Sequence, residues 1–172
     1  MRNAHNLSGN GGFLRIPRCF LACLLVSFAS SAAVAAGPIT SLEIHDFDSG
    51  AHVMTLALDE PSAWILEWRH SVTGILVHDY FAIREGRIVL EQSHMPSFDA
   101  GLGHIPGRGR LESDGNHGYW VRDINEPVTG NRFLLRVGDV GVNDHTLIIE
   151  DRRINLSELV PRQLVVMTIG EP

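Results

Sequence analysis

Apolar and polar residues alternate in short runs from residue 39 to residue 170, and turn residues separate the runs. The clearest run is Ala63–Ser71, where side chains alternate between an apolar face, with Trp64, Leu66, Trp68 and His70, and a mixed face, with Ile65, Glu67 and Arg69. A period of two is typical of a strand that buries one face. Val72-Thr73-Gly74 then predicts a hairpin turn. In the returning run, Ile75–Arg84, Asp79 shares a face with Val77 and Phe81.

The other runs complete an all-β pattern. They are Ile39–Phe47, His52–Leu58, Arg87–Gln92, Gly118–Asp123, Asn131–Val137, His145–Glu150 and Gln163–Ile169. Ile154–Leu159 predicts a single helical turn, with Asn155 or Ser157 as its cap. We therefore expect a single-domain antiparallel β-sandwich or a partly closed barrel of about eight or nine strands, because such a sheet must cover its apolar face and manage its edges.

The N-terminus has a different pattern. Residues 1–18 carry three arginines and no acid, an apolar run follows from Cys19 to Ala29, and small residues lead to Ala33-Val34-Ala35. This is the pattern of a secretory signal peptide, residues 1–36, cleaved after Ala35 or Ala36. The alternative is an uncleaved anchor, since the uncharged stretch is near the minimum length that spans a bilayer. We expect a periplasmic or exported protein, held at the inner membrane if the segment is not cleaved.

Removing that segment changes the composition of the remaining domain, residues 37–172. Both cysteines are lost, and 11 arginines remain against 20 acidic residues, a net charge of −9 with no lysine. A cysteine-free domain has no disulfide, no thiol nucleophile and no thiolate metal ligand. Such an acidic domain is not expected to bind nucleic acid.

Residues 95–118 interrupt the strand pattern with many Gly, Pro, Ser, Asp and His residues. A long irregular stretch in a small β domain is often functional. Arg108 and Arg110 in this stretch, and Arg136 within a later strand, are candidates for binding a carboxylate in a bidentate manner. The alternatives are that the first two are solvated and that Arg136 pairs with an acid on a neighbouring strand.

Histidines suggest a second kind of chemistry. Eight lie beyond residue 36, and none are spaced as in a common metal motif. His94, His104 and His117 share the irregular stretch and are the best candidates for a loop-built metal site. The alternative is that they are ordinary surface residues.

His70 has a different setting, at the end of an apolar strand face. A buried imidazole needs hydrogen-bond partners, which Ser71, Thr73, Asp79 or His78 could supply. The structural interpretation is a histidine that pins the hairpin, and the functional one is a binding residue. A Ser-His-Asp triad is not expected, because the side chains of adjacent residues His70 and Ser71 point to opposite faces of a strand. We therefore predict no catalytic residue.

Several of these segments together carry a family resemblance over about residues 42–169. They are Ser41-Leu42, Asp48-Ser49-Gly50, Trp68-Arg69-His70-Ser71-Val72-Thr73, Asp79-Tyr80-Phe81, Phe98-Asp99-Ala100-Gly101-Leu102, Trp120 and Leu134-Leu135-Arg136-Val137. The chain resembles domain-of-unknown-function family 1850, small exported bacterial proteins. The resemblance implies an association with TRAP transporters of the TAXI type, which import small organic anions with the help of a solute-binding protein. It implies no catalytic residue and no cofactor.

We expect a non-enzymatic exported accessory of such a transporter. Its partners would be the transporter components or solute-binding protein, and it would act by protein contact or by binding a small carboxylate. The predicted binding residues are His70, Ser71, Thr73, Asp79, Asp99, Gly101, Arg108, Arg110 and Arg136. The alternative function is a His-based metal-binding protein or metal-dependent enzyme that uses His94, His104 and His117.

Overall fold

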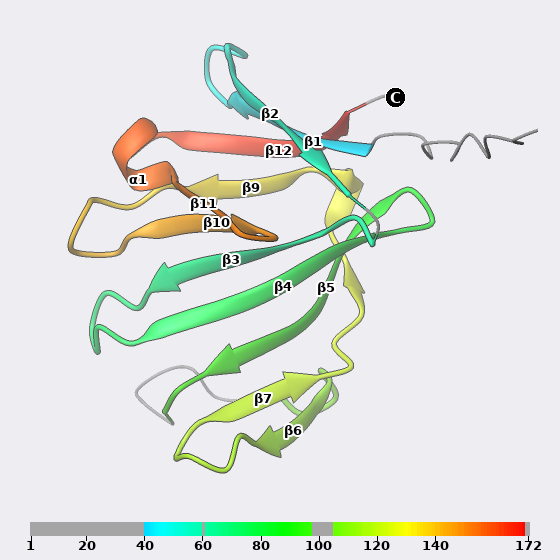
Figure 1. The fold of residues 1–172 in the computed structure, drawn as a ribbon, viewed down its shortest axis with the longest axis vertical. Coiled ribbons are helices and arrows are strands. Elements are labelled where there is room, and N and C mark those ends of the chain that lie inside the picture. Colours follow the sequence, from blue (N-terminus) through cyan, green and yellow to red (C-terminus); the bar gives the residue numbers. More distant parts are fainter. Residues whose placement is uncertain (1–39, 60, 98–104, 171–172) are drawn as a thin grey trace, which may run out of the picture. The chain divides into compact units, whose positions relative to one another are not determined.

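The computed structural model describes residues 40–59, 61–97 and 105–170, which form two antiparallel sheets (Figure 1). The smaller sheet has the order β2 (His52–Leu58), β1 (Thr40–Asp46), β12 (Leu164–Gly170) and β9 (Phe133–Arg136). The larger sheet has the order β11 (Arg152–Asn155), β10 (His145–Ile149), β3 (Ala63–Arg69), β4 (Leu76–Arg84), β5 (Arg87–Met95), β7 (Tyr119–Arg122) and β6 (Arg110–Ser113). The two-residue strand β8 (Glu126–Pro127) pairs with β5.

The core lies between the inward faces of the two sheets. Leu42 and Ile44 of β1 are fully buried, and Trp64 and Leu66 of β3 are nearly so. These residues belong to one apolar cluster, as the alternation of each strand predicts. The all-β expectation is confirmed, and of the two architectures expected the described residues form the sandwich.

Two turns show why the chain reverses where it does. Glu85 and Gly86 both have positive φ, 51° and 70°, between β4 and β5. That pairing is the two-residue hairpin connection whose twist matches the flanking strands. At the other end, helix α1 (Leu156–Leu159) begins at Asn155, whose side chain accepts a hydrogen bond from the backbone N–H of Glu158. The expected helical turn and its Asn cap are thus confirmed.

The structure differs from the sequence expectation in the number of strands. It has twelve in its described part, because β6, β8 and β11 are short strands that the pattern did not reveal. The strand expected to reach Ser71 ends at Arg69, since residues 71–73 form the turn. The remaining helical element is a 3-10 turn, η1 (Thr129–Asn131). None of the described helices is long and apolar enough to cross a membrane.

Candidate functional site

A carboxylate on the core-facing side of the larger sheet is the centre of the candidate site. Asp79 lies on β4 between the buried residues Val77 and Phe81, directly opposite Leu66 of β3. The indole Nε1 of Trp68 donates a hydrogen bond of 2.8 Å to its Oδ2. On the other side of β4, the hydroxyl of Ser93 donates one of 2.5 Å to its Oδ1. Each oxygen of the carboxylate is therefore fixed by a donor from a neighbouring strand.

The surroundings of Asp79 change its acidity. Burial raises the pKa of this carboxyl group above its ordinary value of 3.8. The hydrogen bonds from Ser93 and Trp68, together with the charges of Arg108 and His78, oppose that rise. A partly buried acid with a raised pKa and fixed oxygens is a frequent feature of binding sites.

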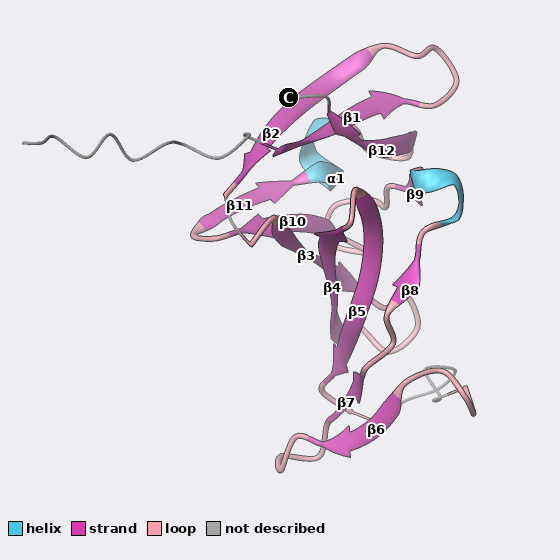
Figure 2. Ribbon diagram, turned by 90° about the vertical axis from the view of Figure 1, so that its right-hand side faces the viewer, coloured by secondary structure: helices cyan, strands magenta, loops and turns pink. Residues whose placement is uncertain are grey.

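A cavity of about 230 Å³ adjoins Asp79. Its apolar walls come from β4, β5, β8 and β9, where Figure 2 shows β8 running beside β5. The polar groups that line it are Asp79, Arg108, Glu126 and Thr129. Arg108 donates from Nε to Oε2 of Glu126 at 2.7 Å, and its terminal guanidinium nitrogens have no partner among the described residues. The cavity thus contains two acids and one guanidinium.

The hairpin end next to this site is organised by His70. Its Nδ1 accepts a hydrogen bond from the backbone N–H of Thr73 at 3.3 Å and lies 3.0 Å from the hydroxyl of Thr73. The backbone N–H of His70 donates to the carbonyl of Ile75 at 2.9 Å. The imidazole also lies 6.2 Å, centroid to centroid, from the Trp68 ring. Trp68 therefore contacts both the hairpin end and Asp79, while Ser71 is exposed in the turn.

The other predicted arginines are placed elsewhere. Arg110 forms an exposed ion pair with Asp123 at 3.2 Å, and Arg136 donates to the carbonyl of Arg162 at 3.1 Å. Neither residue lines the Asp79 cavity. Asp99 and Gly101 lie outside the described residues. Of the predicted binding residues, the structure brings together Asp79 and Arg108 in one cavity.

The two described histidines of the metal alternative, His94 and His117, have different surroundings. The Nε2 atom of His94 lies 3.1 Å from Oδ2 of Asp114. The centroid of its ring lies 4.5 Å from that of the Trp120 ring. His117 is exposed in a turn with a φ of 69°. His104 lies outside the described residues. Among the described residues there is no group of three or more side chains that could hold a metal ion.

Sequence reasoning missed Trp68, Ser93 and Glu126 as members of the site. A signal for the first two was present, because an acid on an apolar strand face requires donors on the flanking strands. Trp68 stood on that same predicted face. Glu126 gave no such signal, since its strand has two residues.

The family comparison covers this whole arrangement. The family model of a domain of unknown function (DUF1850) matches residues 65–156, more than half of the chain, and the chain belongs to this family. The matched segment includes Asp79, Ser93, Arg108 and Glu126. No curated protein and no solved structure matches the chain.

Proposed function

We propose that this protein is an exported, non-catalytic accessory of a TAXI-type TRAP transport system and that it binds a small organic solute beside Asp79. Membership of the family supports the transport context, which the sequence resemblance implied. The basic and apolar N-terminal pattern supports export. The observation that carries the binding role is the cavity that brings the partly buried Asp79 together with Arg108.

The size and charge of the cavity define the solute. Drug-sized ligands occupy cavities of roughly 300–1,000 Å³, so a cavity of about 230 Å³ favours a smaller molecule. The planar guanidinium of Arg108 suits a carboxylate, which it can bind in a bidentate manner. Asp79 and Glu126 give the cavity a net negative charge, which suits an ammonium group on the same molecule. We therefore propose a small amino acid as the solute.

A thermal-shift screen with amino acids, small dicarboxylates and divalent metals tests this proposal. A ligand present at about 100 times its Kd adds roughly 2.7 kcal/mol of stability. We expect an amino acid to raise the Tm, and calorimetry to show binding. Stabilisation by zinc or copper alone would overturn the proposal in favour of the histidine-based alternative.

Arg108→Gln supplies the site-specific test. The Arg108 and Glu126 side chains are 42% and 57% exposed, so losing their ion pair costs about 0–1 kcal/mol and leaves the fold intact. We expect the variant to weaken amino-acid binding at least tenfold. Arg110→Gln is the matched control, because Arg110 also pairs with an exposed acid but does not line the cavity. Equal effects of the two substitutions would overturn the assignment.

The transport context needs a separate test. We expect the protein, cross-linked in its native host, to be recovered with a transporter subunit or its solute-binding protein. Mass spectrometry of the same sample is expected to show a chain that begins at residue 36 or 37. A full-length chain would instead support a membrane-held form. Recovery without any transport component would argue against the accessory role.

A further inference from the structure

A second cavity, of about 350 Å³, lies where β3 begins and β10 ends. Its apolar lining includes Ile65, Tyr80 and Ile148. Ile65 pairs directly with Ile148 of β10 and with Tyr80 of β4, so the three side chains form a row across three strands. This row lies on the face opposite to Leu66, which points into the core. The cavity therefore opens on the outer face of the larger sheet.

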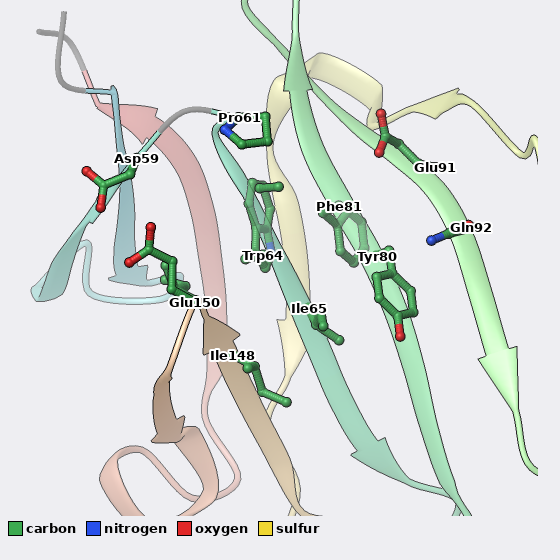
Figure 3. A pocket seen from close by; sticks show the side chains of 12 residues that line it. Asp59, Pro61, Trp64, Ile65, Tyr80, Phe81, Glu91, Gln92, Ile148 and Glu150 are labelled. Atoms are coloured by element: carbon green, nitrogen blue, oxygen red, sulfur yellow. The ribbon is translucent and has the colours of Figure 1, made fainter. Parts of the chain in front are cut away.

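All charged residues that line this cavity in the described part of the chain are acids. They are Asp59, Glu91 and Glu150. Figure 3 shows Asp59 and Glu150 on one side of the row and Glu91 on the other. Glu91 forms an ion pair with Arg84, with 2.7 Å between a guanidinium nitrogen of Arg84 and Oε1 of Glu91. Asp59 and Glu150 are exposed and have no hydrogen-bond or ion-pair partner in the described part of the chain.

This arrangement selects a ligand by two criteria. Apolar surface that enters the cavity gains about 25 cal/mol for each Å² removed from water. The carboxylates on the rim attract a cation and repel an anion. We propose that the cavity binds a small hydrophobic amine, with its apolar body on the row of Ile65, Tyr80 and Ile148 and its ammonium group between Asp59 and Glu150.

This ligand class differs from that of the Asp79 cavity. The described residues supply no cation to the lining of the outer cavity, whereas Arg108 lines the inner one. At the outer site the carboxylate of an amino acid therefore has no cation to pair with among the described residues. An amine without a carboxylate is preferred there. The two sites are separable by their ligands as well as by their residues.

Binding of phenylethylamine tests the proposal, with 3-phenylpropionate as the matched anion. In low salt we expect the amine to shift the NMR signals of the Ile65 and Ile148 methyl groups in a saturable way, and the anion to bind at least tenfold more weakly. High salt reduces the preference, because the carboxylates are exposed. Equal binding of the two compounds, or shifts that spread over the whole protein without saturation, would overturn the proposal.

Charge-removing variants locate the ammonium group. The Asp59→Asn, Glu150→Gln double variant is expected to weaken phenylethylamine binding about two- to thirtyfold, the range for two exposed ion pairs. Glu158→Gln is the matched control, since Glu158 is an exposed acid in α1 that does not line this cavity. All substituted side chains are exposed, so folding is retained. A change of less than twofold in the double variant would contradict the proposed position of the ligand.

Discussion

The indole Nε1 of Trp68 donates a 2.8 Å hydrogen bond to the partly buried carboxylate of Asp79 across the β3–β4 pairing. Trp64, four residues earlier on the same strand face, has a buried Nε1 with no hydrogen-bond partner in the described part of the chain. The two tryptophans thus share a strand and a face but differ in the role of their N–H group. This difference allows the hydrogen bond to be separated from ring packing.

Replacing each tryptophan by phenylalanine removes the indole N–H and keeps an aromatic ring, so the two variants compare the free energy of the hydrogen bond with that of packing. A hydrogen bond to a charged group contributes about 1.5–3 kcal/mol, so we expect Trp68→Phe to lower the free energy of unfolding by more than Trp64→Phe. Packing alone predicts the opposite order, because Trp64 is only 2% exposed and Trp68 is half-buried. Urea unfolding of both variants gives the comparison. A larger cost for Trp64→Phe would contradict the importance of the Asp79 contact.

Stability is also expected to depend on pH through Asp79. Since burial raises its pKa above 3.8, the folded state holds this proton more tightly than the unfolded chain. The stabilisation from the protonated form is full below about pH 3.8 and is lost as the pH rises through the folded pKa. The stability that wild type has relative to Asp79→Asn is therefore expected to decrease as the pH rises from about 3.5 to 7 in urea unfolding.

Asp114→Asn is the control with the opposite sign. Backbone N–H donation from Asn116 lowers the pKa of Asp114, and His94 lowers it further. Its stabilisation is present above the unfolded pKa and is lost as the pH falls through the folded one. The difference from wild type should therefore grow with pH for Asp114→Asn. Parallel pH profiles for the two variants would show that the assignment for Asp79 is wrong.

The strands with strong alternation were predictable because each buries one whole face. The faces of β3 and β4 follow directly from the spacing of Trp64, Leu66 and Phe81. Strands β6 and β11 were not predictable in this way. All four residues of β6 are exposed, and β11 begins with two exposed arginines, so these edge strands are held by backbone pairing that leaves no apolar period.

Individual residues of the candidate site were predictable from the same alternation, but their arrangement in space was not. Alternation placed Asp79 on one strand face with Val77 and Phe81, and a Gly-rich stretch drew attention to Arg108. Their proximity was not predictable, because it depends on the path of a long irregular segment. Glu126 joins them through β8, which pairs with β5 at only two positions. Such contacts follow from tertiary packing and have no local sequence pattern.

His70 provides a test of the hairpin end. Because its Nδ1 accepts from the Thr73 N–H, His70→Ala is expected to lower the free energy of unfolding by about 1 kcal/mol. Hydrogen exchange at the Thr73 and Gly74 amides is expected to accelerate. His52→Ala is the control, since His52 is exposed and contacts the side chain of Thr55. Unchanged exchange at Thr73 would exclude the pinning role.

Asn131 connects the β4–β5 hairpin to the segment before β9. Its Oδ1 accepts from the Ile88 N–H at 2.7 Å, and its Nδ2 donates to the Gly86 carbonyl at 3.0 Å. Asn131→Ala loses both hydrogen bonds and places alanine at a φ of 57°, so we expect a loss of about 1–3 kcal/mol in urea unfolding. Asn131→Asp keeps the Oδ1 acceptor and is expected to lose less. If the two substitutions cost the same, the bond to Ile88 does not hold the hairpin in place.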